Sequence, residues 1–191
     1  MKYFSIQDWK TGEPWDRIQA DRKRCREYLE TIRPHLPPDL QRLCDFSPVW
    51  SEERLSLNDG QLSQMSASYA DQTVTLVLNG DYSDTEGNQI GQRRFTLNYT
   101  GVTEFQVNAG SENAYNLGPD AEPQAEPQAE TTSSVFSGSI EFDDHGWDEI
   151  ELVEDNLIEH RMLFASGTET AVRFRGFTLE TVDTPHTKAT G

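Results

Sequence analysis

Cysteines, long apolar runs and secretion signals are scarce or missing in this 191-residue chain. Its two cysteines, Cys25 and Cys44, do not form a CxxC pair. This favours reduced thiols, with a disulfide or redox pair as the alternative. No apolar run approaches the roughly 18 residues that cross a bilayer, and residues 1–12 lack the apolar core of a secretory signal. These absences predict a cytoplasmic protein.

Local signatures of common catalytic chemistry are also missing. The chain has no phosphate loop of the GxGxxG or GxxxxGK[ST] type, no GxSxG nucleophile turn and no HExxH zinc pair. Because a catalytic triad needs no fixed order in the sequence, these absences do not exclude an enzyme. We leave enzymatic activity open, lean toward a protein that is not an enzyme, and predict no cofactor.

Basic side chains are scarce in the C-terminal two-thirds of the chain. Residues 61–191 carry 22 acidic and 6 basic residues, whereas residues 1–60 carry 11 and 10. The formal net charge of −17 repels phosphate backbones and anionic membrane surfaces. We therefore expect no nucleic-acid or membrane partner, and a basic protein is the partner that such a surface favours.

The N-terminal segment, residues 1–46, is predicted to be an arm followed by helices. Pro14 and Pro34 bracket apolar side chains that are spaced as on one face of a helix. These side chains are Trp15, Ile18, Cys25, Leu29 and Ile32. A second, shorter helix is predicted within residues 37–46, with Leu40, Leu43 and Cys44 facing inward.

After residue 46 the apolar period changes from 3.6 to 2, which is typical of antiparallel strands. Two β-meanders are predicted, at 47–107 and 135–182, with a flexible Pro/Glu/Gln/Ala-rich loop at 108–134 between them. An interdomain linker is the alternative for that loop, and residues 183–191 are predicted to be a frayed tail. The predicted fold class is α+β, with N-terminal helices packed on an antiparallel sheet of about six to eight strands. The meanders would form a sandwich or partial barrel within one globular domain.

The two β-regions agree in order and spacing, which favours an internal repeat. Asp59 and Asp144 follow similar apolar-x-apolar runs and are interpreted as backbone turns. Residues 70–72 and 154–156 occupy matching places later in each region. The pattern apolar-x-apolar-x-Gly-apolar-Thr closes both regions, at Gly101 and Gly176, where we predict a β-bulge or a close backbone approach.

The M-K-Y-F opening, Trp9, the N-terminal helix and the N-D-G at 58–60 resemble uncharacterised bacterial domain-of-unknown-function proteins. In that group such an opening precedes one or two H-D-x-x-apolar β-units. Here Asn58 stands where His is usual, and His145 follows Asp144 instead of preceding it. The resemblance implies a bacterial protein but no activity. Some similarly built bacterial proteins are immunity proteins that bind toxins.

The stretch DDHGWDE at 143–149, with His160 in a later strand, is the best candidate for chemistry. Its nitrogen and oxygen donors suit Mn, Zn or Ca, and the candidate metal ligands are Asp144, His145, Asp148 and His160. An acidic, solvated turn is the alternative, and no metal site is assigned. His160 is in phase with apolar neighbours, so we interpret it as buried and hydrogen-bonded rather than as a ligand.

Alternation along the same strands predicts a solvent-facing row of acids, made of Glu149, Glu151, Glu154 and Glu159. The sequence thus favours a binding or interaction protein with an acidic surface. Immunity-type inhibition of a basic partner is one form of that function. The alternative is a small-ligand- or metal-binding enzyme that uses a cleft near Asp143 to Glu149 and His160. The oligomeric state stays open.

Overall fold

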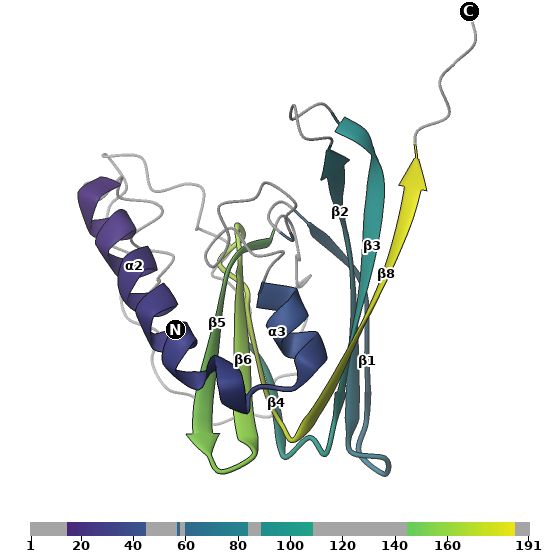
Figure 1. Cartoon of the computed structure of the whole chain (residues 1–191). Coiled ribbons are helices and arrows are strands. Elements are labelled where there is room, and N and C mark those ends of the chain that lie inside the picture. Colours follow the sequence, from purple (N-terminus) through teal and green to yellow (C-terminus); the bar gives the residue numbers. More distant parts are fainter. Residues whose placement is uncertain (1–14, 45–56, 58–59, 84–88, 109–144, 186–191) are drawn as a thin grey trace, which may run out of the picture.

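The computed structural model describes residues 15–44, 57, 60–83, 89–108 and 145–185 (Figure 1). Within these ranges lie two α-helices and eight strands, and the strands form two four-stranded antiparallel sheets. The predicted α+β fold is confirmed, with two separate sheets instead of one. The predicted turns at Asp59 and Asp144, the strand expected near 135–142 and residues 109–134 of the predicted loop lie outside the described residues, whereas Asn108 ends a strand.

The helices follow the predicted pattern. Helix α2 (Trp15–Ile32) ends just before Pro34, and a 3-10 turn, η1 (Arg33–His35), leads into helix α3 (Pro38–Cys44). Buried side chains lie on one face of α2 at Cys25, Leu29 and Ile32, and on α3 at Leu40, Leu43 and Cys44. Both helices therefore pack an apolar stripe against the sheets, as the sequence predicts.

Sheet A has the strand order β1-β2-β3-β8. Its strands are β1 (Gln61–Ser68), β2 (Thr73–Ser83), β3 (Gln89–Thr100) and β8 (Gly176–Pro185). Alternate side chains of β2, β3 and β8 face the core, including Leu76, Leu97 and Leu179, which are paired in register across β2 and β3 and across β3 and β8. Strand β8 runs to Pro185, so residues 183–185 of the predicted tail belong to a strand, and residues 186–191 lie outside the described residues.

Sheet B has the strand order β4-β7-β6-β5. Its strands are β4 (Glu104–Asn108), β5 (His145–Glu154), β6 (Leu157–Phe164) and β7 (Glu169–Phe174). The strand predicted to run through Gly176 is therefore two strands, β7 and β8, which belong to different sheets. Val172 and Phe174 before the break, and Phe177 and Leu179 after it, are all buried.

The two halves of the chain share one topology. Strands β1, β2 and β3 form a meander and β4 joins the other sheet, while β5, β6 and β7 form a meander and β8 joins the first sheet. The first hairpin of each half turns at a residue with positive φ, Gln72 (φ 52) or Asn156 (φ 62). The topology therefore agrees with the predicted repeat, and each half supplies the fourth strand of the other half's sheet.

Gly101 and Gly176 mark the corners where the chain passes between the sheets, so the predicted bulges are wrong, whereas the predicted alternative of a close approach is found at Gly176. Gly101 has φ +61, which favours glycine. A Cβ on Gly176 would lie 2.4 Å from Oγ1 of Thr100, the residue opposite it in the β3–β8 register. The two crossings thus lie side by side, and both need a residue without a side chain.

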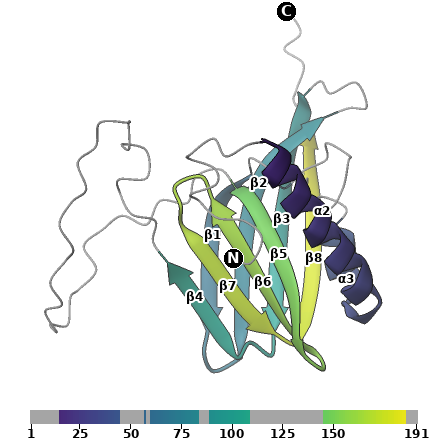
Figure 2. The same ribbon diagram turned by 90° about the vertical axis from the view of Figure 1, so that its left-hand side faces the viewer.

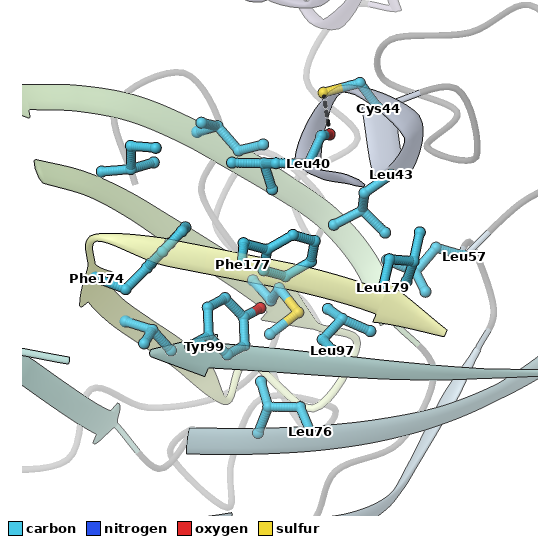
Figure 3. Close-up of a cluster of buried hydrophobic side chains, with 14 of the residues drawn as sticks. Leu40, Leu43, Cys44, Leu57, Leu76, Leu97, Tyr99, Phe174, Phe177 and Leu179 are labelled. Carbon is cyan, nitrogen blue, oxygen red and sulfur yellow. Dashed lines mark hydrogen bonds between the residues drawn. The ribbon is translucent and has the colours of Figure 1, made fainter. Parts of the chain in front are cut away.

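The hydrophobic core fills the space between the sheets and beneath α3. Figure 3 shows Leu40 and Leu43 of α3 facing Leu97, Phe177 and Leu179 of sheet A. At its centre Tyr99 packs edge-on against Phe174, with ring centroids 4.9 Å apart. Tyr99 and Phe174 occupy matching positions two residues before the corner glycines, so the centre of the core is also where the two halves meet.

The helices cover the side of the sandwich formed by β5 and β8. Tyr28 of α2 accepts a hydrogen bond from the backbone N–H of Leu152 on β5 (3.2 Å). Asp39 of α3 accepts one from the N–H of Leu179 on β8 (3.1 Å). Since β5 and β8 are the outermost strands of their sheets on this side, helix side chains satisfy groups that an uncovered edge would leave open. Strands β1 and β4 lie on the opposite side (Figure 2).

Candidate functional site

Three of the candidate residues meet in the interior. His145 and Asp148 on β5 and His160 on β6 have no exposed surface. We call these three, together with Tyr99 and Thr170, the buried polar cluster. Asp144, the fourth candidate ligand, lies outside the described residues.

A chain of polar contacts joins the two sheets through this cluster. The Tyr99 hydroxyl of sheet A lies 2.8 Å from Nδ1 of His160 in sheet B. On the other side of the ring, Nε2 of His160 lies 3.5 Å from Oδ2 of Asp148. The interpretation of His160 as a buried, hydrogen-bonded histidine is confirmed at Nδ1. The order Tyr–His–Asp is one that enzymes use to move protons when a substrate can reach it.

Burial sets the protonation of two members of the cluster. It raises the pKa of Tyr99 well above the usual 10, and the nearby Asp148 carboxylate adds to this rise. Burial also lowers the pKa of His145 below the usual 6.5; Asp148 opposes that change and His160 reinforces it. At neutral pH the hydroxyl is therefore protonated and the His145 imidazole is neutral.

The cluster lies beneath the surface of the described residues. Its members line neither of the two surface grooves described below. Within the described ranges, no group of three or more His, Cys, Asp or Glu side chains could hold a metal ion. Five side-chain atoms of the cluster make no hydrogen bond within the described residues, namely both ring nitrogens of His145, Nε2 of His160, Oδ2 of Asp148 and Oγ1 of Thr170. Within the described residues the cluster is thus a buried polar contact between the sheets.

The acids predicted to face solvent occupy two environments. Glu154 is exposed and Glu151 half-buried, but Glu149 and Glu159 are buried, so the prediction is wrong for these two. Glu159 contacts Arg161 beside it and Arg173 on β7. The arginine side chains flank the carboxylate and shield it from water while they neutralise it, which alternation alone cannot predict.

Glu159 belongs to a charged row on the outer face of sheet B. Glu151, Glu159, Arg173 and Glu104 lie in register across β5, β6, β7 and β4. Arg173 Nη1 lies 2.6 Å from Glu104 Oε2. A shallow groove of about 220 Å³ runs over this row. Its charges are paired across strands, so the row stabilises the sheet surface and leaves no unmatched arginine among these groups.

The open side of the sandwich, where β1 and β4 lie, has a different character. Met65 and Ala67 of β1 pair with Leu76 and Val74 of β2, so they face the interior layer. Even so, Met65 is 38% exposed, whereas Leu76 is completely buried. The interior layer is therefore incomplete along β1.

A groove of about 390 Å³ lies between β1 and the start of β4. Apolar side chains contribute much of the groove's lining, among them Val74, Val102 and Phe105. Glu104 is the charged residue of that lining. Tyr69 lies at its rim in the β1–β2 turn and is wholly exposed. Local sequence patterns do not predict this groove, because it depends on which strands are outermost in the two sheets.

No protein-family model, curated protein or solved structure matches this chain. Among the described helices, none is long and apolar enough to cross a membrane.

Proposed function

We propose that this is a non-enzymatic binding protein whose open side, along β1 and β4, receives a basic protein partner. The observation that carries the proposal is the contrast between the two sides of the sandwich. On the helix side, Tyr28 and Asp39 hydrogen-bond to outermost strands. On the open side, inward-facing Met65 remains exposed next to an apolar groove.

Charge supports a basic partner. Residues 61–191, which include both sheets, carry 22 acidic and 6 basic side chains. Such an excess attracts a basic protein over long distances and speeds its association, and it disfavours nucleic acids and anionic membranes. Inhibition of a basic toxin, as by immunity proteins, is one form that this binding would take. Cys25 and Cys44 are not disulfide-bonded, which suits the reducing cytoplasm where we place the protein.

The test has two stages. Proteins retained by the immobilised full chain at low salt are identified, and each purified candidate is then titrated against the chain at about 50 and 200 mM salt. We expect submicromolar binding to a basic protein, with an association rate that falls as salt rises. Binders that are acidic, or whose rates do not depend on salt, would contradict the proposal.

The enzyme alternative makes a separate prediction. A divalent metal would raise the melting temperature, and His145→Ala would abolish that rise. We rank this alternative second because His145, Asp148 and His160 are completely buried.

A further inference from the structure

Building on the proposed binding function, we infer how the partner binds. An extended, basic segment of the partner adds to sheet A as a new strand beside β1 and places an apolar side chain in the groove between β1 and β4. This mode is strand addition, in which main-chain hydrogen bonds supply affinity and pockets for alternate side chains supply specificity.

Strand β1 has the features of an edge that accepts another strand. It is the outermost strand of sheet A, is eight residues long and reads QLSQMSAS, with no charged residue and no proline. Edges that avoid pairing are usually short, charged, interrupted by proline or covered. The outermost strands β5 and β8 are covered by helix side chains, so the contrast lies within one molecule.

The exposed inner face of β1 indicates what the added segment would bury. Met65 and Ala67 face the same way as the core residues Leu76 and Val74, and both are exposed. A segment beside β1 would present every second side chain to this layer. One of those side chains would enter the groove, where Val102 and Phe105 offer apolar contacts.

Charge distinguishes a basic segment from a second copy of this chain. Glu104 at the groove already pairs with Arg173, whereas Asp71 is exposed in the turn that follows β1. A Lys or Arg of the segment that lies near this turn would therefore gain an acidic neighbour. Two copies of a chain with a net charge of −17 would repel each other on approach, which disfavours pairing of β1 with itself.

The first experiment selects from a displayed library of random ten-residue peptides on the immobilised full chain. We expect enriched peptides in which apolar residues alternate with Lys or Arg. Synthetic versions are then N-methylated at one residue at a time. Because alternate residues of an added strand donate to the edge, methylation should weaken binding by about tenfold or more at every second position and little between them.

A pair of variants on the same strand tests the face. Ala67→Glu puts a carboxylate in the groove, whereas Ser66→Glu puts the same charge on the outer face, because Ser66 pairs with Thr75. We expect Ala67→Glu to abolish peptide binding and Ser66→Glu to preserve it. Circular dichroism and thermal melting of both variants check that the fold is retained.

The outcomes separate this inference from the proposed function. Salt-sensitive binding of a basic protein that neither variant affects would overturn strand addition and leave the binding function intact. Methylation sensitivity without a two-residue period would overturn strand addition as well. A dimer in light scattering that Ala67→Glu dissolves would assign β1 to a second copy and overturn the inference. If no basic protein or peptide binds the unmodified chain, both proposals are overturned.

Discussion

The contact between Tyr99 and His160 allows a quantitative test of the buried polar cluster. Leu76 and His160 occupy corresponding positions in the two halves of the chain. Each lies four residues after the positive-φ residue of its hairpin turn, Gln72 or Asn156. Both Leu76 and His160 are fully buried. Leucine is therefore accommodated at this place in the fold, and His160→Leu is a substitution with a counterpart in the same molecule.

The expected energies follow from which groups lose a partner. Tyr99→Phe removes the hydroxyl that lies 2.8 Å from His160 Nδ1 and leaves that nitrogen buried without a partner, which should cost about 1–3 kcal/mol. His160→Leu should cost at least as much, because it leaves the Tyr99 hydroxyl and Asp148 facing an apolar side chain. In the double variant, Tyr99→Phe removes a hydroxyl that no longer has its partner, so it should add little. We expect a coupling energy of about 1–2 kcal/mol.

Equilibrium unfolding in urea, followed by tryptophan fluorescence, measures these differences. For a chain of this size each kcal/mol also shifts the melting temperature by about 2–4 °C. Tyr69→Phe is the matched control, because Tyr69 is wholly exposed and should change stability by less than about 0.5 kcal/mol. Single-variant effects that add within about 0.5 kcal/mol would refute the assignment of this contact as an energetic link between the sheets.

Three further predictions concern His145, the corner and the helix side. Burial lowers the pKa of His145, so the folded protein binds a proton less readily than the unfolded chain. Stability should therefore fall as pH drops below about 6.5. In His145→Leu, the urea midpoint measured between about pH 5 and 8 should depend less on pH. Gly176→Ala places a methyl group 2.4 Å from Thr100 Oγ1 and should cost about 1–3 kcal/mol, and adding Thr100→Ala should recover part of the lost melting temperature. Asp39→Ala removes the acceptor of the Leu179 N–H, which should cost about 1 kcal/mol and speed exchange of that amide, whereas Asp39→Asn should largely preserve it.

Each of these three predictions has a result that would contradict it. An unchanged pH profile in His145→Leu would mean that other groups set the acid sensitivity. Equal stability of Gly176→Ala and the unmodified chain would mean that the corner relaxes at low cost. Equal amide exchange in Asp39→Ala would mean that solvent or another group replaces the carboxylate.

Local sequence signals predicted the elements well because their causes are local. Pro34 ends α2 whatever lies around it, and the alternation at Phe95, Leu97 and Tyr99 requires one buried face. The phase change after Gly176 was also detected. Its meaning was not, because a bulge and a corner between sheets produce the same shift in the pattern.

The candidate site was only partly predictable for a similar reason. The sequence groups His145, Asp148 and His160 because they lie close together along the chain, on consecutive strands. Tyr99 contacts His160 across the sandwich, although the two residues are 61 positions apart in the sequence. Tyr99 shares the inward-facing phase of Leu97 along the strand. That phase predicts that Tyr99 is buried, but it does not identify the residue of the other sheet that Tyr99 contacts. The groove beside β1 depends on which strands are outermost, and strand order is a property of the whole topology.

The exchange of fourth strands between the halves also constrains how the chain is made. Strand β3 pairs with β8, so the first sheet lacks its last neighbour until residues 176–185 have been synthesised. Until then Phe95 and Tyr99 belong to a strand with one unpaired side. Long-range pairing of this type slows folding and prolongs the exposure of aggregation-prone edges. On the ribosome, the nascent N-terminal half should therefore depend on chaperones until the final strand emerges.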